Sequence, residues 1–328
     1  MPAKDFNTTL VIAPIEPRAA IAVQPALSLW KHKQPFGSIS VIANRRVAAI
    51  FSVMAEVSEV IPVPDGLLGT AGKIALLKQL RTRNFSHSFQ LATGTRATAL
   101  GAMLSIKQRH QPNASWLVET YANGDTVALS WQFAALMLGL PERVKSPADL
   151  PIQLPAPTLR SDAIWQRQAL ERMGVTSEFA GEQALRPQNP LFVLYGGTAA
   201  LLSHAIGLSI KNRWPSASVV LICNPRTVVA LGLPIPSADD PITRLGAPSM
   251  SDSLALIASA TALISADEFA IQASAAFLTP VVSIPDTGAR PLHSGRARLS
   301  SLLPKDIVSN LERVLRFDGS SGNIEKLS

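Results

Sequence analysis

Short apolar runs alternate with longer helix-like segments along this sequence, and they do so in two separate series. The first series contains TTLVIAP, SISVIAN, EVIPVP and HSFQLAT, and the second contains PLFVLYGG, SVVLICN, ALISAD and PVVSIP. Each run has the length of a strand and is rich in Val, Ile, Leu or Phe, whereas the segments between them have helical spacing. Strands that alternate with helices predict parallel sheets covered by helices on both faces.

A proline-rich segment, SPADLPIQLPAPTL, separates the two series. Closely spaced prolines favour extended chain, and a length of 328 residues suits two domains better than a single core. We therefore expect an α/β chain with two Rossmann-like, doubly wound domains that face a cleft. The expected parts are residues 1–155, a linker and connecting helix over 156–187, and residues 188–328. Ligands of such sheets bind beyond the carboxyl ends of the strands.

Positive charge is concentrated in the first half. Residues 1–150 hold 15 lysines and arginines against 9 aspartates and glutamates, whereas the remaining residues hold 15 against 14. We therefore expect the first half to meet an anionic partner, either a phosphorylated acceptor or an anionic membrane surface. Ordinary surface solubility is the competing interpretation. Aromatic residues make up 5% and none alternates with a basic run, so we expect no nucleic-acid partner.

Several features indicate a chain that works in a reducing compartment. Cys223, the single cysteine, lies inside the apolar run VVLICN, which predicts a buried thiol and no disulfide framework. The apolar runs are well below the ~20 residues that a spanning helix needs. Asp5 in the first residues argues against a signal peptide. These features predict a cytoplasmic protein.

Motifs in both halves carry a family resemblance. VIAP, VQPAL and SVIAN follow one another in the first half, and LYGGTA, DSLALIASATALISAD and AIQASAAFLTPVV follow in the second. With these motifs the chain resembles glycosyltransferase family 9, the bacterial heptosyltransferases of the lipopolysaccharide inner core, and within it most closely the heptosyltransferase II branch. The resemblance implies a GT-B fold and inverting transfer from an ADP-sugar such as ADP-heptose to a phosphorylated glycolipid. It also implies no metal or other cofactor, and a peripheral place at the inner membrane.

The resemblance indicates candidate residues in the loop after the first strand. The family has Gly-Asp there, and that Asp is its general base, but the matching positions in this chain are Arg18 and Ala19. Glu16 lies three residues before Ala19 and is the candidate base, with a solvated loop acid as the competing interpretation. Arg18 is a candidate for acceptor binding, together with Arg96 at the family's basic position after the fourth strand.

The donor-binding candidates lie in the second half. The family's glycine turn before a helix, where backbone amides and the helix dipole favour a phosphate, is kept at Gly196, Gly197 and Thr198. The family motif Asp-Ser/Thr-Gly-x-x-His corresponds to positions occupied by Asp267, Glu268, Phe269 and Gln272. Glu268 brings negative charge to the place of a pyrophosphate, and Phe269 fills the space that the family's glycine leaves open.

Two functions remain open from these residues. One is an inverting transferase of the family, or one rebuilt for another donor, with Glu16 or Glu268 essential to it. The other is a catalytically degenerate GT-B scaffold that binds a protein partner, a glycan or a membrane assembly without sugar transfer. The second accounts for polar motif residues that are replaced while the apolar framework around them is kept.

Overall fold

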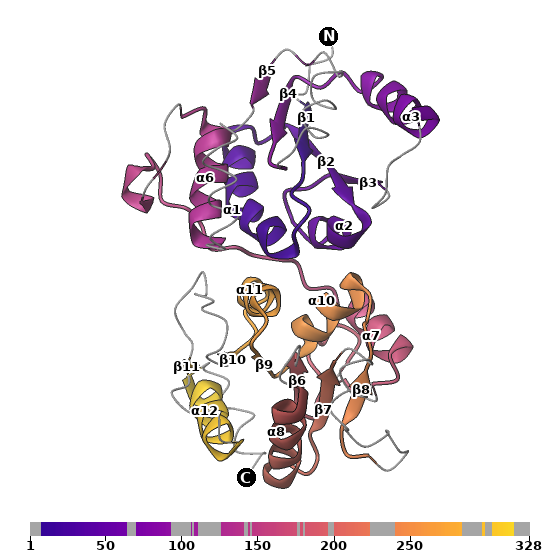
Figure 1. Ribbon diagram of the computed structural model, residues 1–328, viewed down its shortest axis with the longest axis vertical. Helices are drawn as coiled ribbons and strands as arrows, with labels where there is room; N and C mark the ends of the chain where they lie inside the picture. Colours follow the sequence, from indigo (N-terminus) through magenta and orange to yellow (C-terminus); the bar gives the residue numbers. More distant parts are fainter. Residues whose placement is uncertain are drawn as a thin grey trace. The chain divides into compact units, whose positions relative to one another are not determined.

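Each half of the chain is a parallel sheet layered with helices, as Figure 1 shows. The computed structural model describes residues 8–63, 70–92, 106, 108–110, 126–140, 144, 146–175, 178–179, 181–195, 200–223, 240–283, 297–298 and 304–317. The chain divides into two compact units, Met1–Leu159 and Arg160–Ser328. The α/β class with two doubly wound units is therefore confirmed, and the cleft between the units stays a prediction.

The first unit contains a five-stranded sheet in the order β3-β2-β1-β4-β5. Its strands are β1 (Thr8–Ile12), β2 (Ser38–Asn44), β3 (Glu59–Val63), β4 (His87–Gln90) and β5 (Gln108–His110). Its helices are α1 (Pro17–Lys33), α2 (Arg45–Ser52), α3 (Thr70–Arg81) and α6 (Thr126–Leu138), with a short 3-10 turn, η1, at Pro147–Asp149. Ile12 is in register with Ile42 and with Gln90, so β1, β2 and β4 run to the same carboxyl edge.

Helix α1 spans the first unit from one edge of the sheet to the other and packs beside α6 (Figure 1). It begins directly after Glu16 with Pro17 at its first position, where a proline has no hydrogen bond to lose. Its last turn carries Lys31, His32 and Lys33, and the two lysine charges suit the negative end of the helix dipole. The helix thus places Glu16 at the carboxyl edge of the sheet and a basic turn at the amino edge.

The second unit contains a six-stranded parallel sheet in the order β11-β10-β9-β6-β7-β8. Its strands are β6 (Leu191–Tyr195), β7 (Ser218–Ile222), β8 (Thr243–Leu245), β9 (Ala262–Ser265), β10 (Val281–Ser283) and β11 (Ala297–Arg298). Its helices are α7 (Ala163–Arg172), α8 (Ala200–Arg213), α10 (Met250–Ser259), α11 (Glu268–Ala276) and α12 (Pro304–Phe317). Helix α7, which the sequence places in a connecting segment, packs against α10 and is part of this unit.

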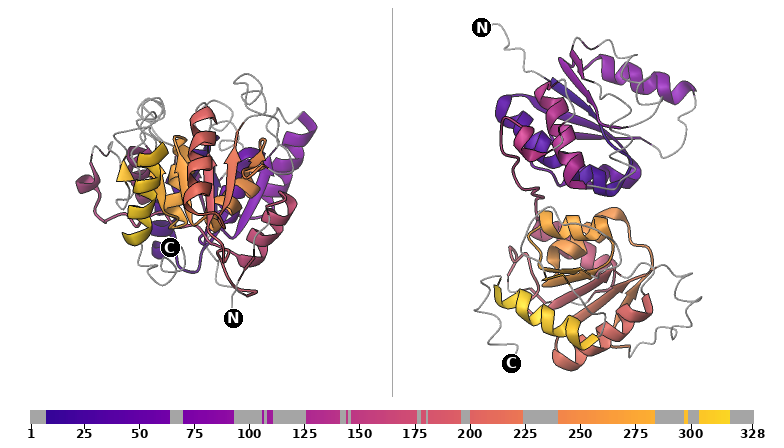
Figure 2. Two further views of the ribbon diagram at one scale, coloured as in Figure 1. Left: turned by 90° about the horizontal axis from the view of Figure 1, so that it is seen from below. Right: turned by 60° about the vertical axis from the view of Figure 1, so that its left-hand side comes forward.

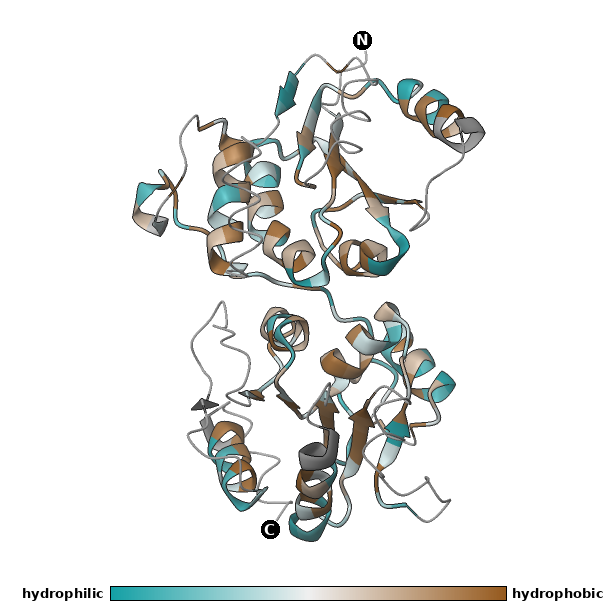
Figure 3. Ribbon diagram, viewed as in Figure 1, coloured by the Kyte–Doolittle hydropathy of each residue, from teal (hydrophilic) through white to brown (hydrophobic). Residues whose placement is uncertain are grey.

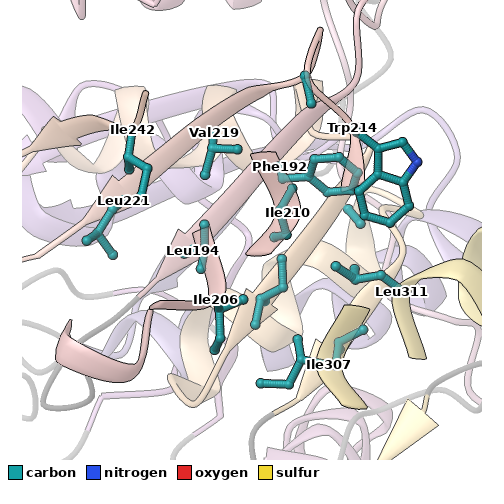
Figure 4. Close-up of a cluster of buried hydrophobic side chains, with 14 of the residues drawn as sticks. Phe192, Leu194, Ile206, Ile210, Trp214, Val219, Leu221, Ile242, Ile307 and Leu311 are labelled. Carbon is teal, nitrogen blue, oxygen red and sulfur yellow. The ribbon is translucent and has the colours of Figure 1, made fainter. Parts of the chain in front are cut away.

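Helices cover both faces of the second sheet. Helices α8 and α12 lie side by side on one face (Figure 2), and α10 and α11 pack on the other. Because both faces are covered, β6 and β7 are apolar along almost their whole length, as Figure 3 shows. Figure 4 shows the core under α8 and α12, where Trp214 stacks on Phe192 with 5.0 Å between the ring centroids.

Three short strands that the sequence does not predict, β5, β8 and β11, are edge strands of their sheets. An edge strand has one neighbour, so it needs no continuous apolar run, and the sequences QRH and TRL have none. The polar residues at 108–110 favour a loop, but the structure places His110 at the end of β5 instead. Strands β5 and β8 also carry ionisable side chains, QRH including an arginine and a histidine and TRL an arginine.

Candidate functional site

The loop between β1 and α1 places Glu16 at the carboxyl edge of the first sheet. Glu16 is the N-cap residue of α1, but its side chain makes no capping hydrogen bond. Its Oε2 instead accepts a hydrogen bond from Arg18 Nε at 3.1 Å, and the Glu16 side chain keeps 46% exposure. A half-exposed carboxylate at this edge is placed to take a proton from a bound hydroxyl group.

Two further arginines lie at the same edge, and sequence reasoning missed them. Asn44 ends β2 and caps α2, its Oδ1 accepting from Val47 N at 3.0 Å, and Arg45 and Arg46 follow as exposed residues of the first helical turn. Cations in a first turn oppose the helix dipole, so they do not serve the helix itself. Together with Arg18 they make this edge suitable for an anion. The signal in the sequence is an arginine pair directly after a strand that ends in a capping Asn.

Helix α11 of the second unit begins with acids instead. Asp267 is its N-cap residue, and its Oδ1 accepts from Ala270 N at 2.9 Å. The Asp267 amide donates to Ser265 Oγ at 2.9 Å, and that hydroxyl donates to the carbonyl of Tyr195 at the end of β6. Glu268 follows in the first turn. The two acids therefore satisfy and neutralise the positive end of α11, which lowers its attraction for a phosphate.

The remaining candidate on α11 is buried. Gln272 has no exposed surface, and Phe269 before it is 8% exposed. Ser274 in the next turn is also buried and donates to the carbonyl of Thr279 at 2.6 Å. In this structure the Gln272 amide therefore does not present itself to a ligand in solvent, and its role in donor binding stays a prediction.

Four of the sequence candidates lie outside the described residues: Gly196, Gly197, Thr198 and Arg96. The residues that can be placed fall into two groups on different units, Glu16 with Arg18 on the first and Asp267, Glu268 and Gln272 on the second. Each group lies at the carboxyl end of a strand, β1 or β9, where ligands of doubly wound sheets bind.

The second unit also contains a buried ion pair, which the sequence does not reveal. Arg244 Nη2 on β8 lies 2.9 Å from Asp240 Oδ2, and the two side chains are 4% and 12% exposed. Arg244 also lies 3.5 Å from Nδ1 of His204 on α8. Burial and the Arg244 charge lower the pKa of His204, against an opposing effect of Asp240, and burial raises the pKa of Cys223 nearby. This cluster fixes α8 and β8 to each other.

A second ionisable cluster lies in the first unit, toward the amino edge of the sheet and away from Glu16. The rings of His87 and His110 are parallel with centroids 6.3 Å apart, and Trp30 of α1 packs edge-on against His87 at 5.1 Å. Burial lowers the pKa of both histidines, and the charge of Lys33 lowers both further. Both rings are therefore held neutral near pH 7. No group of three metal-ligating side chains occurs among the residues described.

At the level of sequence, no family model and no curated protein matches this chain. Solved structures do match. E. coli ADP-heptose LPS heptosyltransferase II superposes with a TM-score of 0.72 at 17% identity, over 94% of this chain and 98% of that one. A family 9 glycosyl transferase from Veillonella parvula gives 0.68 at 11% identity, over 95% and 98%.

Two more solved structures also resemble the chain. E. coli heptosyltransferase WaaC with ADP-2-deoxy-2-fluoro heptose gives a TM-score of 0.60 at 14% identity, over 93% of this chain and 99% of that one. UDP-GlcNAc 2-epimerase from Neisseria meningitidis gives 0.51 at 14% identity, over 95% and 94%. These matches show a GT-B-like fold, and they confirm at the level of fold the likeness to family 9 that the motifs predict. No helix among the described segments is both long enough and apolar enough to cross a bilayer.

Proposed function

We propose that the chain is a glycosyltransferase that moves a sugar from a nucleotide-sugar to a phosphorylated acceptor. By likeness it is an inverting heptosyltransferase that takes an ADP-sugar and acts in lipopolysaccharide core synthesis. The observation that carries the proposal is Glu16, a half-exposed acid at the carboxyl end of β1. Its setting is a fold that superposes on heptosyltransferase II over 94% of the chain.

The proposed chemistry uses the carboxyl edge of the first unit. Glu16 takes the proton of the acceptor hydroxyl as its oxygen bonds to the anomeric carbon, and the bond from that carbon to the diphosphate breaks as ADP leaves. Arg18 holds the carboxylate through its 3.1 Å hydrogen bond. Arg45 and Arg46 at the same edge supply positive charge for an acceptor phosphate. The Gly-Gly-Thr sequence at 196–198 is the proposed cradle for the donor diphosphate.

Glu16→Gln tests this role directly. The amide cannot take the proton, so transfer from ADP-heptose to a phosphorylated core acceptor should fall by about a hundredfold or more. Because the Glu16 side chain does not cap α1, the melting temperature should stay nearly unchanged. Glu178→Gln, at an exposed position of the second unit, is the matched control and should transfer like the wild type. Equal rates for Glu16→Gln and wild type would remove Glu16 as the base.

The second candidate function is a GT-B scaffold without sugar transfer, and the start of α11 favours it. There Asp267 is used as a helix cap, Glu268 adds negative charge, and Gln272 is buried, so the described donor-side residues have no cation for a diphosphate. Such a protein would bind a partner, a glycan or a membrane assembly.

A nucleotide titration separates the two candidates. A working donor site binds ADP and ADP-heptose in the folded state, so both should raise the melting temperature in a saturable way. Glu268→Gln should strengthen that response if the acid repels the diphosphate, and should abolish transfer if it serves a rebuilt site. No thermal response to either nucleotide at millimolar concentration would leave the scaffold as the function.

A further inference from the structure

The turn between α1 and β2 presents one large apolar side chain to solvent. Phe36 is 82% exposed, the highest exposure of the described large apolar residues. The turn beneath it is held in place, because Gly37 N donates to the carbonyl of Gln34 at 3.0 Å and Lys31 Nζ donates to the carbonyl of Gly37 at 2.6 Å. Phe36 is therefore fixed in an exposed position on an ordered turn.

Two lysines and a histidine lie directly before this turn. Lys31, His32 and Lys33 form the last turn of α1 immediately before it, and His32 and Lys33 are exposed. Lys33 Nζ lies 5.6 Å from the ring centroid of Trp30, whose Nε1 donates to Thr9 Oγ1 of β1 at 2.9 Å. The basic turn is thus anchored to the sheet, and we call Lys31, His32, Lys33 and Phe36 the amino-edge surface.

Two long spans of the first unit contain no acidic residue. No aspartate or glutamate occurs from residue 17 to residue 55 or from residue 66 to residue 118, a span that includes α1, β2, α3, β4 and β5. Glu59, an acid at the start of β3, is paired with Arg83. Every charged residue in these two spans is therefore a lysine or an arginine, which favours a positive field at the amino-edge surface.

We propose that the amino-edge surface docks the protein on an anionic lipid bilayer. A bilayer interface accepts an aromatic side chain at the level of the headgroups and attracts cations within a Debye length of its surface. Phe36 supplies the apolar contact, and the lysines supply the attraction to acidic headgroups. A nucleic-acid duplex presents phosphates but no apolar layer that would receive Phe36, so it fits this surface less well.

Docking here leaves the carboxyl edge of the same sheet away from the lipid. Strand β1 has five residues, which at about 3.3 Å each separate the two edges by roughly 17 Å. The surface is therefore separate from Glu16, and its use does not depend on sugar transfer.

Vesicle sedimentation of the full chain tests the proposal. Vesicles of phosphatidylcholine alone should leave the protein in solution, whereas an equimolar mixture with phosphatidylglycerol should sediment it. The bound fraction should fall in about 1 M salt, where the Debye length is about 3 Å. Equal sedimentation with both vesicle types, or none with either, would overturn the proposal.

Two substitutions locate the surface. Phe36→Ser should weaken binding to the mixed vesicles by about tenfold or more, and Lys33→Glu by a similar factor. Ile164→Ser and Lys305→Glu change an exposed apolar residue and an exposed cation on the second unit, and both should bind like the wild type. Wild-type binding by Phe36→Ser and Lys33→Glu would show that the lipid contact lies elsewhere.

Insertion of the turn can be observed directly, because Cys223 is the single cysteine and is buried. A polarity-sensitive dye on Phe36→Cys should shift its emission to the blue with the mixed vesicles. The same dye on Ile164→Cys should not shift. An unshifted label at position 36 on sedimented protein would contradict insertion.

Discussion

Two helices of the first unit and three of the second begin with opposite charges. In the first unit, α1, α2, α3 and α6 have no acid in the first turn, and α1 and α2 carry Arg18, Arg45 and Arg46 there instead. In the second unit, α10, α11 and α12 each have an acid in the first turn, at Asp252, Glu268 and Asp306. An acid stabilises a helix at this position, and a cation does not.

Some of these charges stabilise the fold through contacts within their own unit, whereas others are exposed and available to a ligand. Asp252 accepts from Arg172 Nη2 at 2.7 Å and takes part in the cap of α10 with Ser249, so its charge is used inside the unit. Arg45 and Arg46 are exposed beside a helix start that attracts anions. The described residues of the first unit are therefore better suited to an anionic ligand than those of the second.

Removing one buried charge of the second unit gives the largest expected effect. Asp240→Ala leaves Arg244 charged and buried without its carboxylate, which should lower the free energy of unfolding by about 3–5 kcal/mol. Glu16→Ala breaks the half-exposed pair with Arg18 in the first unit and should cost at most about 1 kcal/mol. Urea unfolding of both variants measures the contrast. Similar decreases in the free energy of unfolding would show that the two units do not differ in how they use their charges.

Arg45 and Arg46 test the other side of the comparison. Replacing both by Ala should weaken the binding of inorganic pyrophosphate about tenfold or more, because charge-assisted hydrogen bonds to an anion are lost. Lys305→Ala with Arg313→Ala removes two exposed cations of α12 and should leave the affinity unchanged. Isothermal titration calorimetry measures both. Equal affinities would place the anion site away from the start of α2.

The apolar pattern was sufficient to predict most of the fold. The runs TTLVI, SISVIAN, LFVLY and SVVLI are strands as expected, because a strand covered on both faces or on its inner face needs such residues. The prediction failed at β5, β8 and β11, whose partly open positions are compatible with Gln, Arg and Thr. Edge strands are defined by neighbours that a single segment does not reveal.

The candidate site was only partly predictable. Glu16, Asp267 and Glu268 were found through the family resemblance, whose motifs align just after strands that the sequence does show. The burial of Gln272 depends on the packing of segments far apart in the sequence. The pairing of Arg244 with Asp240 depends on how the chain turns into the edge strand β8. Arg45 and Arg46 were visible in the sequence, but the family motif provided no reason to consider them.

Asp267 offers a smaller test of how the second unit uses its acids. Asp267→Ala removes the hydrogen bond to Ala270 N and should lower the free energy of unfolding by about 1 kcal/mol. Asp267→Asn keeps a capping oxygen and should lose much less, although it removes the charge. Thermal unfolding of the two variants measures the difference. If Asp267→Asn lowered the free energy of unfolding as much as Asp267→Ala, the fold would require the charge of Asp267 and not its capping oxygen.

The histidines provide the smallest expected effect, seen as a pH dependence. His87 and His110 in the first unit and His204 in the second all have a pKa below the usual value of 6.5. Below about pH 6.5 the unfolded chain binds protons that the folded chain does not, so stability should fall as the pH decreases through that range and then level off below the folded pKa. His87→Gln with His110→Gln should reduce this slope more than His204→Gln, because two titrating groups are removed instead of one. Urea unfolding at pH values above and below 6.5 measures the slopes, and a larger change for His204→Gln would move the main acid-sensitive group to the second unit.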